Sequence, residues 1–240
     1  MRNSISKQEI REKIWRLMEE KNIAKFPRPV YGRIPNFKGN IIAASKFIKH
    51  ILFRNAKIIF CNPDSPQRPI REAVLKYRKT LVMATPRLRE GFIIIEPGYV
   101  PRGREYAAST IRGAFKYGKT VDKLSFKIDV KVTGCVAVSK DGGRVGKGGG
   151  YSDLEYALLR EMHAIDESTP IVTTVHDIQI VDYIPMTEHD MPVDFIFTPT
   201  QIIEVKPRRK RPPGIIWSEL DPRKMEEIPI LKKYCYNKLK

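Results

Sequence analysis

A glycine-rich run that joins a predicted strand to a predicted helix constrains the fold of this chain more than any other feature. Six of the twelve residues from Gly142 to Asp153 are glycine. The run follows residues 128–138, whose apolar and β-branched side chains predict a strand. It leads into residues 151–165, which have the spacing of an amphipathic helix. A strand, a short loop and a helix in this order are typical of α/β proteins with a parallel sheet.

The same run has the composition of a phosphate-binding loop. Glycines leave their backbone N–H groups accessible, and successive amides form an anion-binding nest beside the positive end of the helix dipole. Arg144 and Lys147 add positive charge, and Asp153 could hold a divalent cation that bridges phosphate oxygens. The run therefore predicts a nucleotide polyphosphate ligand, although a loop that is only flexible is the alternative. It matches neither the P-loop pattern, because Gly148 follows Lys147, nor the dinucleotide fingerprint.

Apolar runs and helical periods alternate along most of the chain. The predicted strands are 56–61, 80–85, 92–96, 128–138, 171–175 and 193–198, and the predicted helices are 7–21, 41–53, 70–78, 104–117 and 151–165. This alternation favours a mostly parallel sheet with helices on both faces, in which ligands bind beyond the carboxyl ends of the strands. We predict one α/β domain over residues 1–204, then a basic, proline-containing extension over 205–240 that begins with a charged linker.

The net charge of +17 points to anionic partners. From residue 205 onward the chain has eleven Lys or Arg residues against four Asp or Glu residues. Five of the six residues from Lys206 to Arg211 are cationic, which suits contact with the phosphate backbone of RNA or DNA. The alternative for this run is a solvated, flexible linker. Charge alone does not separate nucleic-acid binding from nucleotide binding.

Cysteine and hydropathy patterns argue against several classes of protein. Cys61 and Cys135 each lie in an apolar run, as expected of buried, reduced thiols in a cytoplasmic protein. Neither the cysteines nor the histidines have the spacing of a zinc site. The sequence has no apolar span long enough for a transmembrane helix, and its first residues lack the apolar region of a signal peptide. We therefore predict a cytoplasmic protein without membrane association.

The predicted helix at 7–21 begins with a capping box formed by Ser6 and Glu9. Lys7 and Arg11 lie four residues apart and share a face near the start of this helix. From their spacing alone, they form either a solvated basic edge or part of a binding site.

Together these motifs resemble the 5-formyltetrahydrofolate cyclo-ligase family, also called methenyltetrahydrofolate synthetases. Members of that family have the pattern G-x-R-[LVI]-G-x-G-x-G-Y-Y-D after a strand that opens with Ile-Asp, and they begin with a Lys-x-x-x-Arg helix. The corresponding positions here are 142–153, 128–129, Lys7 and Arg11. The segments SKQEIREKIW, FPRPVYGRIPNFKG, TPRLR, GRVGKGGGYSDLEYAL, TPIVTTVHD and FTPT are similar to a divergent eukaryotic branch, the cyclo-ligase-like domain of methenyltetrahydrofolate synthetase domain-containing proteins.

The resemblance implies a three-layer, Rossmann-like α/β fold and a reaction that depends on ATP and Mg²⁺. In that reaction ATP phosphorylates the formyl oxygen of 5-formyltetrahydrofolate, a folate nitrogen attacks, and ring closure releases phosphate, which yields the 5,10-methenyl product and ADP. The resemblance assigns catalysis to Arg144 and Lys147, through positioning and neutralisation of phosphate charge. It assigns Mg²⁺ to Asp153. The residues it assigns to ATP binding are Lys7, Arg11, Arg144, Gly146, Lys147, Gly148, Gly149, Gly150 and Tyr151.

The departures from the family lie on the folate side. Where enzymatic members have Glu-[IVL]-x-Thr, residues 64–67 are Asp-Ser-Pro-Gln, so the carboxylate is one methylene shorter and a glutamine replaces the threonine. The paired tyrosines of the family are Tyr151 and Ser152 here. We expect Asp64, Gln67 and Tyr151 to contact a reduced folate or a modified pterin. The alternative is an ATP-binding protein that has lost the reaction and serves RNA binding or regulation.

Three other polar groups have two interpretations each. The pair at 176–177 follows a predicted strand and either orients a substrate or forms a hydrogen-bonded turn. Arg87 and Arg89 also follow a strand and either reach an anionic ligand or lie on the surface. Residues 188–190 are better interpreted as a solvated loop than as a functional group.

Overall fold

The fold is built around an eight-stranded sheet. The computed structural model describes residues 5–238. The strands of this sheet are β1 Ile58–Cys61, β2 Thr80–Ala84, β3 Phe92–Ile95, β4 Lys119–Val121, β5 Val130–Thr133, β8 Ile171–Thr174, β10 Phe195–Phe197 and β11 Ile202–Glu204. Their spatial order is β11-β10-β8-β5-β1-β2-β3-β4, and the five strands from β10 to β2 are parallel. Antiparallel pairing begins only at β3 and at β11. The predicted α/β class with a mostly parallel sheet is confirmed.

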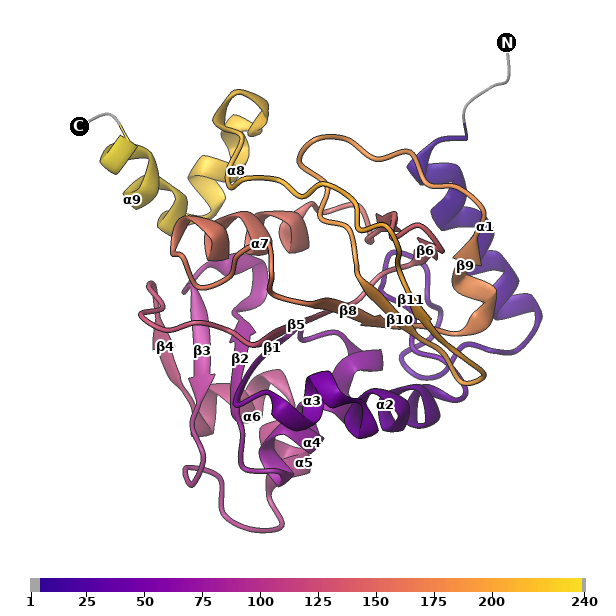
Figure 1. Ribbon diagram of the computed structural model, residues 1–240, viewed down its shortest axis with the longest axis horizontal. Coiled ribbons are helices and arrows are strands. Elements are labelled where there is room, and N and C mark those ends of the chain that lie inside the picture. The colour runs from indigo at the N-terminus through magenta and orange to yellow at the C-terminus, as the bar shows by residue number, and fades with distance from the viewer. Residues whose placement is uncertain (1–4, 239–240) are drawn as a thin grey trace.

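Helices cover both faces of the sheet, which gives three layers (Figure 1). The helices are α1 Lys7–Glu20, α2 Asn40–Lys49, α3 Ile51–Asn55, α4 Arg68–Lys76, α5 Glu105–Ala108, α6 Ile111–Tyr117, α7 Tyr151–Glu161, α8 Pro222–Glu227 and α9 Pro229–Lys238. α2 to α6 pack on one face and α7 to α9 on the other.

The alternation of side chains along each strand divides the core between these two faces. In β1, Ile59 and Cys61 pack with α2 to α6, whereas Phe60 packs with α7. In β5, Val130 and Val132 likewise face α2 to α6. Successive strand residues point to opposite faces, so both layers are apolar and every second residue serves each of them. Cys61 and Cys135 are buried, as predicted.

A second, three-stranded sheet packs against α1 and has the strand order β7-β6-β9. Its strands are β6 Ala137–Ser139, β7 Arg144–Val145 and β9 Ile180–Val181. α1 contributes Ile10, Ile14 and Met18 to a separate apolar cluster with Ala137 and Val145. This small sheet therefore places the N-terminal helix next to the glycine loop.

The prediction of one strand over residues 128–138 is wrong. β5 and β6 belong to different sheets, and the chain bends between them at Val136. A Cβ at Gly134 would lie 2.8 Å from both Gln67 Oε1 and Ile34 Cγ2, so a larger residue there would force these side chains to shift. The apolar run continues across the bend because both strands are buried.

The prediction of one helix over residues 104–117 is also wrong. α5 ends at Ala108 and α6 begins at Ile111, with Thr110 as its N-cap. The Thr110 side chain accepts a hydrogen bond from Gly113 N. A Cβ at Gly113 would lie 1.9 Å from Ala107 O, so the two short helices approach too closely for any other residue.

The C-terminal extension packs against α7 (Figure 1). Ile215, Ile228 and Leu231 are buried in the same apolar cluster as Tyr156 and Leu159 of α7. The proposed domain division at residue 205 stays a prediction, but the extension shares its apolar core with the sheet.

The basic run at 206–211 is largely paired with acidic residues. Arg208 and Arg211 both contact the carboxylate of Asp194, and Arg209 pairs with Asp141. Arg211 is only 4% exposed. At Arg211, therefore, the interpretation as a solvated linker is wrong.

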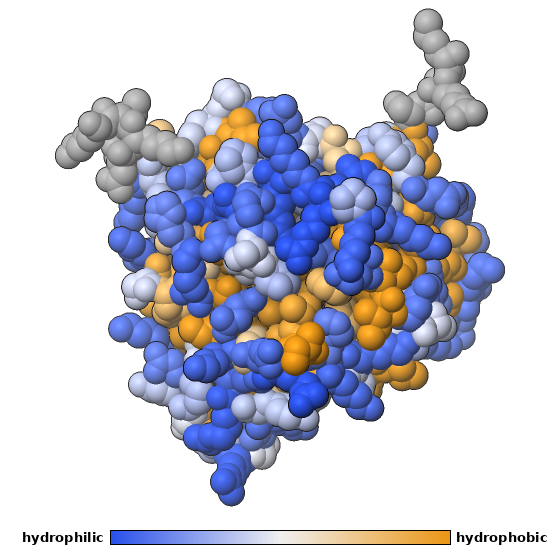
Figure 2. Space-filling view, in the orientation of Figure 1, coloured by the Kyte–Doolittle hydropathy of each residue, from blue (hydrophilic) through white to orange (hydrophobic). Residues whose placement is uncertain are grey.

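Hydrophilic residues cover most of the face shown in Figure 2, with apolar side chains in patches between them. None of the described helices is long and apolar enough to cross a membrane.

Candidate active site

The glycine loop lies beyond the carboxyl end of β5 and leads into α7. Gly148 and Gly150 have φ values of 104° and 67°, a region that side chains with a Cβ rarely adopt. Gly150 is also the N-cap residue of α7. The loop separates two cavities, of about 310 Å³ and about 500 Å³. Arg144, Gly146, Gly150 and Asp153 line both.

The smaller cavity, which we call the α1 cavity, lies between the loop, α1 and the C-terminal extension. Lys7 and Arg11 line it. Lys7 pairs with Asp190, and Arg11 Nε donates a hydrogen bond of 2.7 Å to the carbonyl oxygen of Gly146. The capping box of Ser6 and Glu9 is present and fixes where α1 begins. Lys7 and Arg11 are therefore parts of a cavity wall rather than of a solvated edge.

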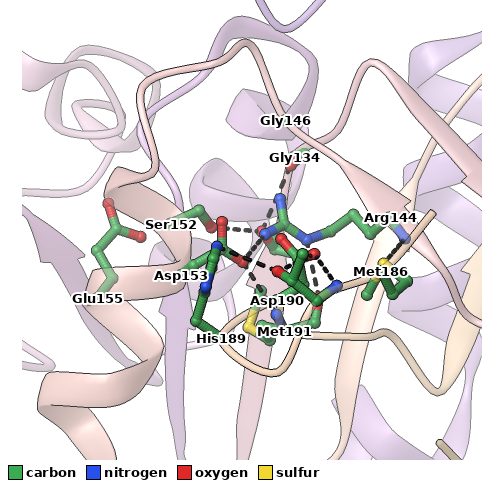
Figure 3. A network of polar contacts seen from close by, with 12 residues as sticks. Gly134, Arg144, Gly146, Ser152, Asp153, Glu155, Met186, His189, Asp190 and Met191 are labelled. Atoms are coloured by element: carbon green, nitrogen blue, oxygen red, sulfur yellow. Dashed lines mark hydrogen bonds and ion pairs between the residues drawn. The ribbon is translucent and has the colours of Figure 1, made fainter. Parts of the chain in front are cut away.

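Arg144, which is buried, and Asp153, which is partly buried, form an ion pair at the centre of the site (Figure 3). Arg144 Nε donates to Met191 O at 3.1 Å, and Met191 N donates to Asp153 Oδ1 at 3.0 Å. Burial opposes the charge of Arg144, but Asp153 raises the pKa of the guanidinium above its ordinary value. Arg144 Nη1 is buried without a hydrogen-bond partner. A permanently charged donor is thus available at the cavity wall, which suits an anion.

Asp190 belongs to this site, and the interpretation of residues 188–190 as a solvated loop is wrong for it. Its side chain is 8% exposed and accepts hydrogen bonds from Lys7 and from Thr187. Burial opposes its ionisation, but these bonds lower its pKa below the ordinary value. No local pattern marks Asp190, because its role depends on a helix more than 180 residues away in the sequence.

The larger cavity, which we call the β1 cavity, contains most of the residues expected on the folate side. Asp64 and Tyr151 line it, together with Lys147 and Gly149. Lys147 Nζ lies 3.4 Å from Asp64 Oδ1. The structure therefore places Lys147 in the wall of the β1 cavity, whereas Lys7 and Arg11 line the α1 cavity.

Gln67 lines neither of these two cavities. Its side chain is fully buried, and its amide nitrogen donates to Thr174 Oγ1 at 3.3 Å. Its Oε1 has no hydrogen-bond partner in the described structure.

A buried charged cluster that the sequence analysis missed lies next to the β1 cavity. Lys131 is fully buried on the α7 side of β5, with Nζ 3.7 Å from Glu155 Oε2 and 4.1 Å from the ring centre of Phe60. Burial lowers the pKa of Lys131 to about 8, although Glu155 opposes this shift. Glu155 accepts a hydrogen bond of 2.5 Å from Asn62, and burial raises its pKa. A lysine within an otherwise apolar strand was the available signal.

Tyr151 connects the loop to the C-terminal extension. Its hydroxyl donates to Glu227 Oε2 at 2.8 Å, and Lys224 Nζ lies 3.8 Å from its ring centre. Both partners are on α8, so the extension is part of the site's surroundings.

The remaining polar groups divide between the two interpretations. His176 caps a short 3₁₀ helix by accepting a hydrogen bond from Ile178 N at 3.1 Å, which favours the hydrogen-bonded turn. Arg87 lines the β1 cavity and faces the same space as Asp64.

The described residues contain no cluster of three or more His, Cys, Asp or Glu side chains that could hold a metal ion. Mg²⁺ commonly takes one or two carboxylates and completes its shell with phosphate oxygens and water. Asp153 and Asp190 both line the α1 cavity and fit that need. Asp153 Oδ1 is already engaged by Arg144 and by Met191 N.

The sheet and the loop together define an α/β protein with a glycine-rich loop at the carboxyl edge of its central strands. This chain belongs to the 5-formyltetrahydrofolate cyclo-ligase family, whose model matches residues 3–199. The resemblance expected from the sequence is confirmed.

Two similar relatives carry the name methenyltetrahydrofolate synthase domain-containing protein. The protein of Bos taurus is 45% identical over 237 residues, which cover 96% of this chain and 62% of the relative. The protein of Homo sapiens is 43% identical over 234 residues, which cover 95% and 61%. The chain thus spans about three fifths of the length of these relatives.

A solved structure supports the fold. The NMR structure of Aquifex aeolicus 5,10-methenyltetrahydrofolate synthetase aligns with a TM-score of 0.54 and 19% sequence identity, over 85% of this chain and 95% of that one. At this identity the likeness establishes the shared fold.

Proposed function

We propose that this protein is an ATP- and Mg²⁺-dependent cyclo-ligase that converts a 5-formyl reduced folate, or a related pterin, to the 5,10-methenyl form. ADP and phosphate are the other products. The observation that carries the proposal is the pair of cavities that meet at the glycine loop. A phosphoryl donor in one and a formyl acceptor in the other would face each other across Arg144 and Gly146.

The α1 cavity supplies what a polyphosphate needs. Lys7 and Arg11 bring positive charge from α1, and Arg144 has an unpartnered N–H in the wall. Gly148 and Gly150 allow the backbone to approach the ligand without a Cβ. Charge-assisted hydrogen bonds of this kind contribute roughly 1.5–3 kcal/mol each. In this proposal Arg144 holds the transferring phosphate in place, and Asp153 holds Mg²⁺.

The β1 cavity supplies what the second substrate needs. Tyr151 offers an aromatic face, and Asp64 offers a carboxylate that can accept from ring N–H groups. Lys147 extends from the loop to within 3.4 Å of Asp64 and would neutralise charge on the transferred group. Because in-line transfer requires little covalent work, positioning and electrostatics would supply most of the catalysis.

The expected contact with RNA and the expected cytoplasmic location are not established by the structure. The cations at 206, 208, 209 and 211 have acidic partners within the chain, so an RNA contact through this run has no support from the described structure. A cytoplasmic location also stays a prediction.

The test is the absorbance of the methenyl product during incubation with ATP, Mg²⁺ and 5-formyltetrahydrofolate, repeated without ATP. We expect ATP-dependent growth of the band. Lys7→Ala should slow it about tenfold or more, because a contact of roughly 1.5–3 kcal/mol is lost. Lys13→Ala is the matched control, since Lys13 lies on the same helix but is exposed. A flat trace with 5-formyltetrahydrofolate and with other 5-formyl pterins, in a preparation that binds ATP, would refute the reaction.

A further inference from the structure

The α1 cavity has an apolar part that the glycine loop does not explain. Leu154 and Ala157 of α7 line it, and so do Ile215, Ile216 and Leu220 of the C-terminal extension. The family model ends at residue 199, so three of these five side chains lie beyond the matched region.

The apolar part extends away from the phosphate-binding groups along α7. Gly150, Asp153, Leu154 and Ala157 are spaced as neighbours on one helical face, and all four line the cavity. At 1.5 Å per residue, Ala157 lies about 10 Å along the helix from Gly150. A ligand that fills this space is therefore charged at the loop and apolar one to two turns farther along α7.

The extension is fixed in place by contacts with the same elements that form the charged part. Ile215 N donates to Glu161 Oε1 of α7 at 3.1 Å. Glu219 contacts His189 Nδ1 at 2.6 Å, next to the buried Asp190. At its far end, Tyr151 donates to Glu227. These three contacts join the extension to both ends of α7 and to the loop at 187–191.

We propose that residues 214–224 form the wall that binds the nucleotide base, a proposal that rests on the function proposed above. The base packs between Leu154 and Ala157 on one side and Ile216 and Leu220 on the other. A purine is a flat ring system with apolar faces, which aliphatic side chains contact well. The α1 cavity is then a complete nucleotide site only when the C-terminal extension is docked.

The experiment compares two ligands that share the phosphates but differ in the base. Wild type, Ile216→Asn and Ile202→Asn are titrated calorimetrically with a non-hydrolysable ATP analogue and with inorganic tripolyphosphate. Ile216 is half-buried in the cavity wall, whereas Ile202 is 45% exposed on β11 and outside the cavity. We expect Ile216→Asn to bind the analogue about tenfold or more weakly, because apolar contact with the base is lost. Its tripolyphosphate affinity, and both affinities of Ile202→Asn, should match wild type.

The other possible outcomes would refute either the base wall alone or the nucleotide site itself. If Ile216→Asn binds the analogue as tightly as wild type, or loses both ligands equally, the base wall is refuted while the proposed function stands. If wild type binds neither ligand, the proposed nucleotide site itself is refuted. Leu220→Ala is the second variant, since it shortens a side chain without adding a polar group, and it should weaken only the analogue. Thermal unfolding of each variant confirms that it is folded.

Discussion

The two cavities beside the glycine loop differ in how their charged groups are paired. On the α1 side, Lys7 contacts Asp190 in a close ion pair, and Arg144 and Asp153, which line both cavities, form another. Next to the β1 cavity, Lys131 Nζ lies 3.7 Å from a carboxylate and has no hydrogen-bond partner in the described structure. In Figure 3, Arg144, Asp153 and Asp190 converge, whereas Glu155, the partner of Lys131, lies apart from them.

This difference in the pairing of charged groups indicates that the two regions would respond differently to a ligand. Ion pairs that already exist hold charged side chains in position, so less reorganisation is needed when phosphates bind. A buried polar atom without a partner lowers stability until a ligand or a proton change satisfies it. Ion pairs therefore hold the charged side chains of the α1 cavity in position, whereas Lys131, next to the β1 cavity, can still change its partner or its protonation state.

The largest expected effect comes from breaking the central ion pair. Arg144→Ala should lower the free energy of unfolding by about 3 kcal/mol, because the partly buried carboxylate of Asp153 loses its cation. The side chain of Asp153 is 19% exposed, which places the loss at the low end for buried pairs. Urea unfolding measures it. The double variant Arg144→Ala/Asp153→Ala should recover part of the lost free energy of unfolding. If Arg144→Ala alone lowers that free energy by less than about 1 kcal/mol, the central ion pair is no stronger than an exposed pair.

The effect of intermediate size is the dependence of the free energy of unfolding on pH, which we attribute to Lys131. Its pKa is about 8 when folded against an ordinary value of 10.5, so the unfolded chain binds more protons between these pH values. The free energy of unfolding should therefore rise with pH across this window, by at most about 3 kcal/mol. Wild type should gain this stability with rising pH, whereas Lys131→Met should not. Urea unfolding of both proteins at equal salt, from about pH 7.5 to about pH 10.5, covers the window between the two pKa values. Parallel curves for the two proteins would show that Lys131 does not titrate there.

The smallest effect is expected at the rim of the β1 cavity. Lys147 and Asp64 form a pair whose side chains are 48% and 20% exposed. Exposed pairs contribute about 0–1 kcal/mol, so a double-mutant cycle of Lys147→Ala and Asp64→Asn should give a coupling free energy below about 1 kcal/mol. Both single variants should nevertheless slow turnover with 5-formyltetrahydrofolate. A coupling energy near that of the central pair would remove the distinction between the two cavities.

Much of the fold could be predicted because its signals are local. β1, β2 and β8 are short apolar runs between turns, and α1 and α7 have clear periods and recognisable starting residues. The break between β5 and β6 could not be predicted, since the run stays apolar on both sides and the side chains that crowd Gly134 come from distant segments. β7 and β9 have two residues each, too few for any period.

The candidate site likewise contains residues that could be predicted from the sequence and residues that could not. The residues of the glycine loop could be named from their spacing, and their neighbours Lys7 and Arg11 through the family pattern. Asp190 and Glu155 depend on contacts with distant segments, so no pattern in their own surroundings identifies them. The contribution of the extension was missed because its basic residues suggested solvent or RNA, whereas its apolar residues decide its position.

Segments that lie far apart in the sequence, at 7–11 and 214–224, form walls of the same cavity. During synthesis the first of these emerges long before the second, so the cavity cannot be completed until residues 214–224 have also emerged. A ligand that touches both walls binds only molecules in which both are docked. At a hundred times its dissociation constant it would add about 2.7 kcal/mol to that docked state, which should protect both segments from fraying, amide exchange and proteolysis.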